Sequence, residues 1–215
     1  PSTTVSYLEN ITVASTRFHN INGFVFDFDF GSQTRYRPFG RQDDLSILIS
    51  DCTVFNSLSG IRIQDLFDHT EVSTILADRP RRMGGWAGSV DFKDCKFRGI
   101  SQKCIEIANK SSTAAVVKFD GCQFEMNSKS GIDAGKAAIN LTKDANKPLQ
   151  IFGGIEFSNC SVQSQIEIPL VLLQLPPADS KVSNLKGNIT VSGKIAAKVV
   201  TRPEGVATEL IIDEK

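Results

Sequence analysis

The sequence has no excess of either charge and no long apolar run. Its 24 basic residues match its 24 acidic residues, so the formal net charge is zero. Nucleic acids and anionic membrane surfaces attract proteins with a basic excess, and this chain offers no such attraction. The longest apolar patch, IPLVLLQL at 168–175, is of strand length, well below the roughly 18 residues of a membrane-spanning helix. We therefore predict no nucleic-acid partner and no transmembrane segment.

Histidine is scarce, and the motifs of several common catalytic sites are missing. The two histidines, His19 and His69, have no cysteine or second histidine at the spacing of a zinc site. No GxSxG motif, phosphate-binding loop or dinucleotide-binding fingerprint occurs. Five cysteines are too few for a disulfide scaffold, and their odd number leaves at least one thiol without an intramolecular partner.

Four of the five cysteines lie in a repeated pattern. Each follows Asp, Asn or Gly, with an apolar residue three places before it and another two places after it. The copies are ILISDCTVFNS, VDFKDCKFRG, VVKFDGCQFEM and GIEFSNCSVQS, which align on Cys52, Cys95, Cys122 and Cys160. A fifth copy, TVASTRFHNING, has Thr16 at the aligned position.

A second apolar alternation follows the copies that contain Thr16, Cys52, Cys95 and Cys122. It begins in each case at a small residue: Gly23, Gly60, Cys104 and, less regularly, Gly131. The repeated unit is therefore a strand, a tight turn, a strand, a short loop and a strand. The shortest period is the 27 residues from Cys95 to Cys122, and insertions lengthen the others. Such periods, with strand alternation and almost no helical periodicity, are typical of a solenoid of stacked coils.

Stacking explains why cysteine recurs. Equivalent positions of successive coils lie about 4.8 Å apart and form ladders inside the solenoid. A ladder position at a tight bend requires a small residue that tolerates burial, which suits Cys and Thr. The preceding Asp, Asn or Gly tolerates the left-handed backbone of a turn. We expect Cys104, beside an apolar strand, to be buried rather than reactive.

These coils resemble the right-handed parallel β-helix of the pectate-lyase-like superfamily over roughly residues 8–175. The resemblance implies an all-β solenoid of about six to seven coils with inserted loops, a fold that many functions share. The paired-aspartate signatures of its polygalacturonase-like hydrolases are absent, as are those of its calcium-dependent lyases. A β-sandwich is the competing architecture.

The C-terminal part is less regular. We assign residues 1–180 to the coils and 181–215 to a last coil or hairpin with a C-terminal cap. Within the latter, 187–201 has the pattern of one more coil or a hairpin, and 207–214 that of a last strand. Such a cap covers the open end of a solenoid, which otherwise exposes unpaired backbone. No cap is evident before residue 8, which favours a fragment of a longer solenoid.

The largest insertion, residues 67–88, is the predicted ligand-binding segment. In solenoids, function sits in loops that a rigid scaffold positions. The only tryptophan lies beside glycines, and its ring can stack on a sugar, while arginines bind carboxylates through two parallel donors. We predict that an acidic polysaccharide binds to Asp68, His69, Arg79, Arg81, Arg82 and Trp86. The alternative is that Trp86 covers the edge of a coil and the arginines are solvated.

A second acidic group lies at residues 26–44. Asp27 and Asp29 are two apart on an expected strand and therefore share a face. With Asp43 and Asp44 they form a candidate oxygen-rich calcium site. Paired carboxylates also act as acid and base in glycoside hydrolysis. The remaining alternative is a solvated face on which the aspartates neighbour Arg35, Tyr36 and Arg37.

The sequence leaves open whether the chain is an enzyme. If it is, the expected activity is that of a polysaccharide lyase or a glycoside hydrolase, with Arg62 and Lys93 as candidate lyase bases. Our first hypothesis is an extracellular, periplasmic or cell-surface protein that binds or processes a polysaccharide along a groove of the solenoid. The alternative is a non-catalytic structural or adhesin-type module. The oligomeric state cannot be derived from the sequence.

Overall fold

In a computed structural model the chain is all-β, with seventeen strands and no helix among the described residues. Every pairing between these strands is parallel. This pairing rules out the β-sandwich, whose sheets are antiparallel. The structure describes residues 10–29, 45–64, 88–108, 110, 115–127, 135–142, 151–175, 181–202 and 204–215.

One coil consists of three strands, and successive coils stack in parallel. The first coil contains β1 (Asn10–Ala14), β2 (Arg17–His19) and β3 (Phe24–Asp29). Three more coils repeat this order: β4 (Leu45–Ser50), β5 (Thr53–Phe55), β6 (Ser59–Gln64), β7 (Gly88–Lys93), β8 (Lys96–Ile100), β9 (Lys103–Ala108), β10 (Ala115–Asp120), β11 (Gln123–Met126) and β12 (Ile139–Thr142).

The fifth and sixth coils merge the first two strands into one long strand. These coils and the strand that follows them are β13 (Ile151–Ile168), β14 (Val171–Gln174), β15 (Lys181–Ile195), β16 (Val199–Arg202) and β17 (Glu209–Glu214). Because β15 pairs in parallel with β13, and β17 with β15, residues 181–202 form a further coil and not a hairpin. The architecture is that of a parallel β-solenoid, as the repeat predicted.

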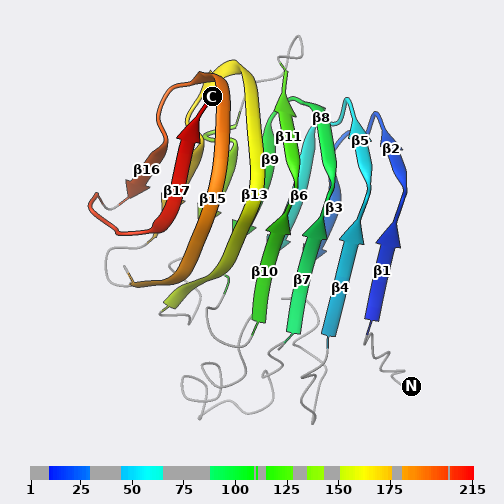
Figure 1. Cartoon of the computed structure of the whole chain (residues 1–215), viewed down its shortest axis with the longest axis horizontal. Coiled ribbons are helices and arrows are strands. Elements are labelled where there is room, and N and C mark those ends of the chain that lie inside the picture. The colour runs from blue at the N-terminus through cyan, green and yellow to red at the C-terminus, as the bar shows by residue number, and fades with distance from the viewer. Residues whose placement is uncertain are drawn as a thin grey trace, which may run out of the picture.

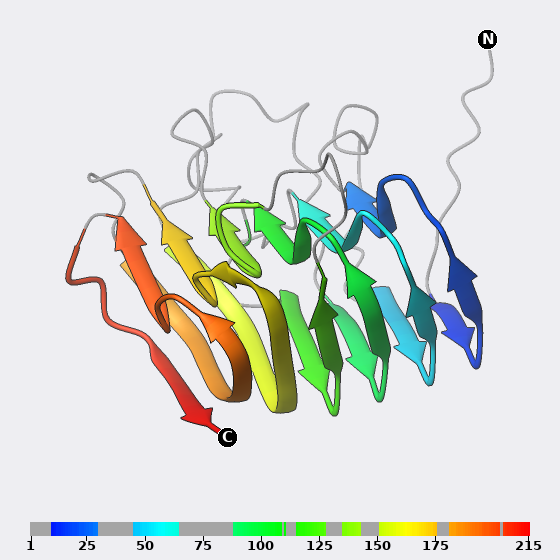
Figure 2. The same ribbon diagram turned by 90° about the horizontal axis from the view of Figure 1, so that it is seen from above.

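The strands form two sheets on opposite sides of the core (Figure 1). The eleven-stranded sheet has two rows. We call β1, β4, β7, β10 and the beginnings of β13, β15 and β17 the first-strand row, and β2, β5, β8, β11 and the ends of β13, β15 and β17 the second-strand row. The third-strand sheet is β3-β6-β9-β12-β14-β16. Figure 2 shows the coils side by side, from the blue N-terminal coil to the red C-terminal strand.

The turn between the first and second rows has the predicted left-handed backbone. The residue before each ladder cysteine has a φ between 52° and 64°, and Ser15 takes the same place in the first coil with a φ of 51°. Short polar side chains and glycine tolerate this conformation at little cost. The turn residues of the cysteine-containing coils are Asp51, Asp94, Gly121 and Asn159.

Ladders of like residues fill the core. All five cysteines are buried and free of disulfides, which confirms the prediction for the cysteine ladder and for Cys104. Each ladder thiol donates to main-chain carbonyls, as Cys122 does to Phe92 at 3.4 Å. Phenylalanine rings stack in the same way, with centroids 5.3 Å apart for Phe92 and Phe119 and 4.8 Å apart for Phe97 and Phe124. These near-parallel stacks add aromatic contacts to the burial of apolar area.

One alignment derived from the repeat is wrong. The interval rule places the third strand of the fourth coil directly after Gly131, but β12 begins at Ile139, in register with Ile105. Ala138, which precedes Ile139 as Cys104 precedes Ile105, therefore takes the small-residue position. The extra residues of this coil lie between its second and third strands, where no sequence rule fixes the length of a connection.

The sixth coil lacks one residue at the turn, and a side chain takes over the missing contact. In the first four coils the turn N–H donates to a main-chain carbonyl of the next coil, as Gly121 does to Ser158 at 2.9 Å. In the fifth coil the N–H of Asn159 donates at 2.9 Å to the side-chain Oδ1 of Asn188. The amide of Asn188 thus replaces a backbone acceptor at the point where β15 runs straight past the turn.

We predict that Asn188→Ala lowers the free energy of unfolding by about 0.5–1.5 kcal/mol, because the N–H of Asn159 loses its acceptor. Asn188→Asp is the matched control, since it keeps an oxygen at the same place. Urea denaturation of the two variants and the parent measures the difference. Equal losses in both variants would contradict this role for the Oδ1 atom.

We also predict that the five thiols stay unmodified in the folded protein. All five are buried, so a thiol reagent cannot reach them in the folded protein. Burial also raises the pKa of the Cys104 and Cys52 thiols, which suppresses the reactive thiolate at these two positions. Colorimetric thiol titration at pH 8 should detect almost none of the five in buffer and all five in guanidinium chloride. Rapid modification of any of them under native conditions would refute the burial of that cysteine.

Candidate functional site

The outward face of the third-strand sheet carries a ladder of alternating charge. Asp27, Arg62 and Glu106 occupy the same register position on β3, β6 and β9. Strand alternation turns them away from the core, toward which Phe26 and Ile61 point. Equivalent side chains on paired strands are direct neighbours, so opposite charges meet along the ladder.

The Arg62 side chain is held from two sides. Its Nε and Nη2 atoms donate to Oδ1 and Oδ2 of Asp27 at 2.7 Å and 2.5 Å, in the two-pronged geometry that arginine forms with carboxylates. Its guanidinium carbon lies 4.9 Å from the centroid of the Phe24 ring. On β9, Glu106 accepts a hydrogen bond from Lys103. The sheet therefore presents oriented charged groups over three consecutive coils.

The ladder of charged residues ends before the fourth coil. The next two positions of the ladder are Asn140 and Leu172, and both are buried. The Asn140 amide donates to the carbonyl of Ala137 at 2.6 Å. The charged residues of this ladder are thus confined to β3, β6 and β9.

The predicted ligand-binding segment is joined to this face through the chain. Residues 65–87 follow Gln64 directly, two positions after Arg62, and residues 30–44 follow the end of β3. The predicted binding residues lie outside the described residues, so the prediction stands untested: Asp68, His69, Arg79, Arg81, Arg82 and Trp86.

The candidate calcium site is only partly described. Asp27 and Asp29 both belong to β3, but Arg62 occupies both carboxylate oxygens of Asp27. The Asp29 side chain, Asp43 and Asp44 lie outside the described residues. Within the described part of the chain, no group of three or more His, Cys, Asp or Glu side chains can hold a metal. Calcium stays a prediction, and to use Asp27 it would have to compete with Arg62.

The two candidate lyase bases are not brought together. Arg62 lies on the third-strand sheet, whereas Lys93 lies on β7 in the first-strand row, on the other side of the core. Arg62 is paired with Asp27, and an arginine keeps its proton throughout the physiological range.

His19 lies in β2. Its ring is exposed and stacks on Phe55 of the next coil, with centroids 4.9 Å apart and an interplanar angle of 10°.

Glu106 is the charged residue of the site that sequence reasoning missed. Its position after Ile105 in CIEIAN matches that of Arg62 in GIRIQD, and this equivalence is the signal that could have identified it.

Comparison of the chain with protein-family models, with curated proteins and with solved structures gave no match. The described residues contain no helix that is long and apolar enough to cross a membrane.

The Asp27–Arg62 pair is testable by a double-mutant cycle with Asp27→Asn and Arg62→Gln. Because the two side chains are 40% and 32% exposed, water screens the pair, and we expect a coupling of about 0.5–1 kcal/mol in the free energy of unfolding. The coupling should fall as salt is added. A coupling of zero at low salt would mean that the two groups do not interact in solution.

Proposed function

We propose that the chain is a right-handed parallel β-helix of the pectate-lyase-like kind and that it binds a polysaccharide along the outer face of the third-strand sheet. Three strands per coil, the left-handed turn residue and the ladders of Cys and Phe support the kinship. A polymer of repeating sugars suits a surface on which polar groups recur about every 4.8 Å.

The observation that carries the proposal is the charged ladder of Asp27, Arg62 and Glu106. The chain continues from the first two strands of this ladder, β3 and β6, directly into the long segments 30–44 and 65–87. A rigid strand fixes each charge, so a ligand can pair with it at little cost in ordering. Residues 65–87 would add Trp86 and a group of arginines to the same site. An extracellular, periplasmic or surface location follows from a polysaccharide ligand and is part of the proposal.

A non-catalytic structural module is the second candidate. The observation in its favour is that several surface charges pair with each other: Asp27 with Arg62, Lys186 with Glu156 at 3.2 Å, and Lys198 with Glu214 at 3.3 Å. Surface pairs of this kind are modest contributors to stability and need no ligand. A spacer or adhesin-type stalk would have such a surface.

The test is a panel of neutral and acidic polysaccharides, followed by the fluorescence of Trp86, the only tryptophan, with and without calcium. We expect a saturable change with acidic polymers that Arg62→Gln weakens about tenfold, the factor that 1.4 kcal/mol represents. Arg202→Gln, at the far end of the same sheet, is the matched control and should bind like the parent.

The ultraviolet absorbance of unsaturated sugars, recorded in the same samples, separates binding from lyase activity. Absorbance that rises with time would extend the proposal to a lyase. If no polysaccharide changes the fluorescence and none is retained in affinity electrophoresis, the polysaccharide proposal fails and the structural module is the better reading.

A further inference from the structure

The second-strand row has a hollow of about 260 Å³ on its outer face. It crosses β8, β11 and β13, so three consecutive coils contribute to it. Its floor is strand backbone, under which the buried rings of Phe97 and Phe124 stack. The polar side chains around it are Lys96, Arg98, Gln123, Glu125, Ser161 and Gln163.

The charges of this hollow do not pair with each other. Arg98 and Glu125 lie on adjacent strands, near the point where the register shifts at a bulge. Within the described part of the chain, Lys96, Arg98 and Glu125 form no ion pair, whereas Asp27–Arg62 and Glu156–Lys186 on other pairs of adjacent strands do. Two cations and one carboxylate thus border the same small volume without a partner.

The backbone around the hollow is fixed. Gly99, which directly follows Arg98, has a φ of 72°, and a Cβ there would lie 2.6 Å from Oδ1 of Asn56. Main-chain hydrogen bonds join β11 to its neighbours at both borders, as from Gln123 to Cys95 and from Ser161 to Cys122, each at 2.9 Å. A site on rigid strands binds a ligand with little loss of conformational entropy.

The lining selects a ligand with groups of both charges. Lys96 and Arg98 border the hollow on β8 and suit a phosphate, sulfate or carboxylate. A purely anionic ligand would also face Glu125 on the next strand, at a cost in repulsion. The carboxylate of Glu125 instead accepts hydrogen bonds from an ammonium group. Gln123, Gln163 and Ser161 offer donors and acceptors to sugar hydroxyls.

We propose that this hollow binds a zwitterionic saccharide, one sugar unit that bears both an anionic group and an ammonium group. The anion lies at Lys96 and Arg98, the ammonium group at Glu125, and the hydroxyls at the amide and hydroxyl side chains of β11 and β13. The volume is just below the range of about 300–1,000 Å³ for ligand pockets and fits a monosaccharide rather than a long chain. The site is separate from the third-strand sheet and does not depend on the function proposed above.

Three matched probes test this inference by titration calorimetry: glucosamine 6-phosphate with both charges, glucose 6-phosphate with the anion only, and glucosamine with the cation only. We expect glucosamine 6-phosphate to bind about tenfold more tightly than either of the others. Arg98→Gln should reduce its affinity to that of glucosamine, and Glu125→Gln to that of glucose 6-phosphate.

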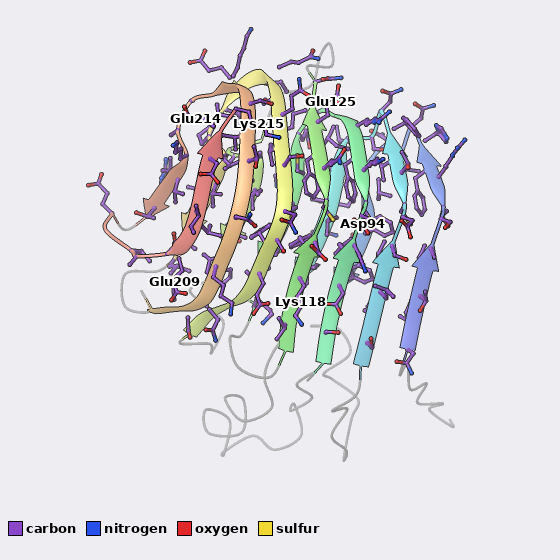
Figure 3. The ribbon with its side chains drawn as sticks, in the orientation of Figure 1. Asp94, Lys118, Glu125, Glu209, Glu214 and Lys215 are labelled. Atoms are coloured by element: carbon purple, nitrogen blue, oxygen red, sulfur yellow. The ribbon has the colours of Figure 1, made fainter. Side chains whose placement is uncertain are left out.

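Lys118→Gln is the control, because Lys118 is an exposed lysine on β10, away from Glu125 on β11 (Figure 3). It should bind all three probes like the parent, and circular dichroism melts should show that every variant is folded. Equal affinity for glucose 6-phosphate and glucosamine 6-phosphate would make the hollow a plain anion site and overturn the proposal. So would the absence of saturable binding. Neither result bears on polysaccharide binding at Arg62, which has its own variant and its own fluorescent reporter.

Discussion

Every strand that the structure describes pairs in parallel with the equivalent strand of a neighbouring coil. This pairing satisfies the backbone of one coil only through the next, so no coil is stable alone and the whole stack forms one core. It also repeats each side-chain position about every 4.8 Å. This repetition determines the composition of the core, because a residue type that packs well against itself can occupy one position in several coils. Phenylalanine does so in two ladders and cysteine in a third.

The same repetition places charged side chains of neighbouring coils side by side on the surface. Some of these opposite charges pair, as Asp27 does with Arg62 on the third-strand sheet and Glu156 with Lys186 in the first-strand row. On the second-strand row, Arg98 and Glu125 border a hollow and form no ion pair with any described residue. A bulge between β8 and β11 accompanies this difference, since it shifts the register at the place where the two side chains would meet.

Where a coil departs from the repeat, a different residue at the same place supplies the missing contact. Where the sixth coil has one residue fewer at the turn, the side chain of Asn188 supplies the acceptor that the backbone supplies elsewhere. Where the ladder passes beyond the last cysteine, Ile189 takes the position of Cys160 in the next coil and is fully buried. At the first coil the position belongs to Thr16, whose hydroxyl donates to the carbonyl of Ala14. The stacked geometry is therefore preserved while the residues that provide it change.

The sequence by itself determined the coil. An Asp, Asn or Gly before each cysteine and apolar residues at fixed distances are local features, and they predicted the turn, the two inward positions and the burial of Cys104. The length of the connection before β12 was not predictable, because a loop can lengthen without changing the strands that it joins. Only the tertiary structure brought Arg62 to Asp27, 35 residues apart in the chain, and Arg98 beside Glu125. Register between coils depends on the lengths of all intervening insertions, and it is set when the strands pair.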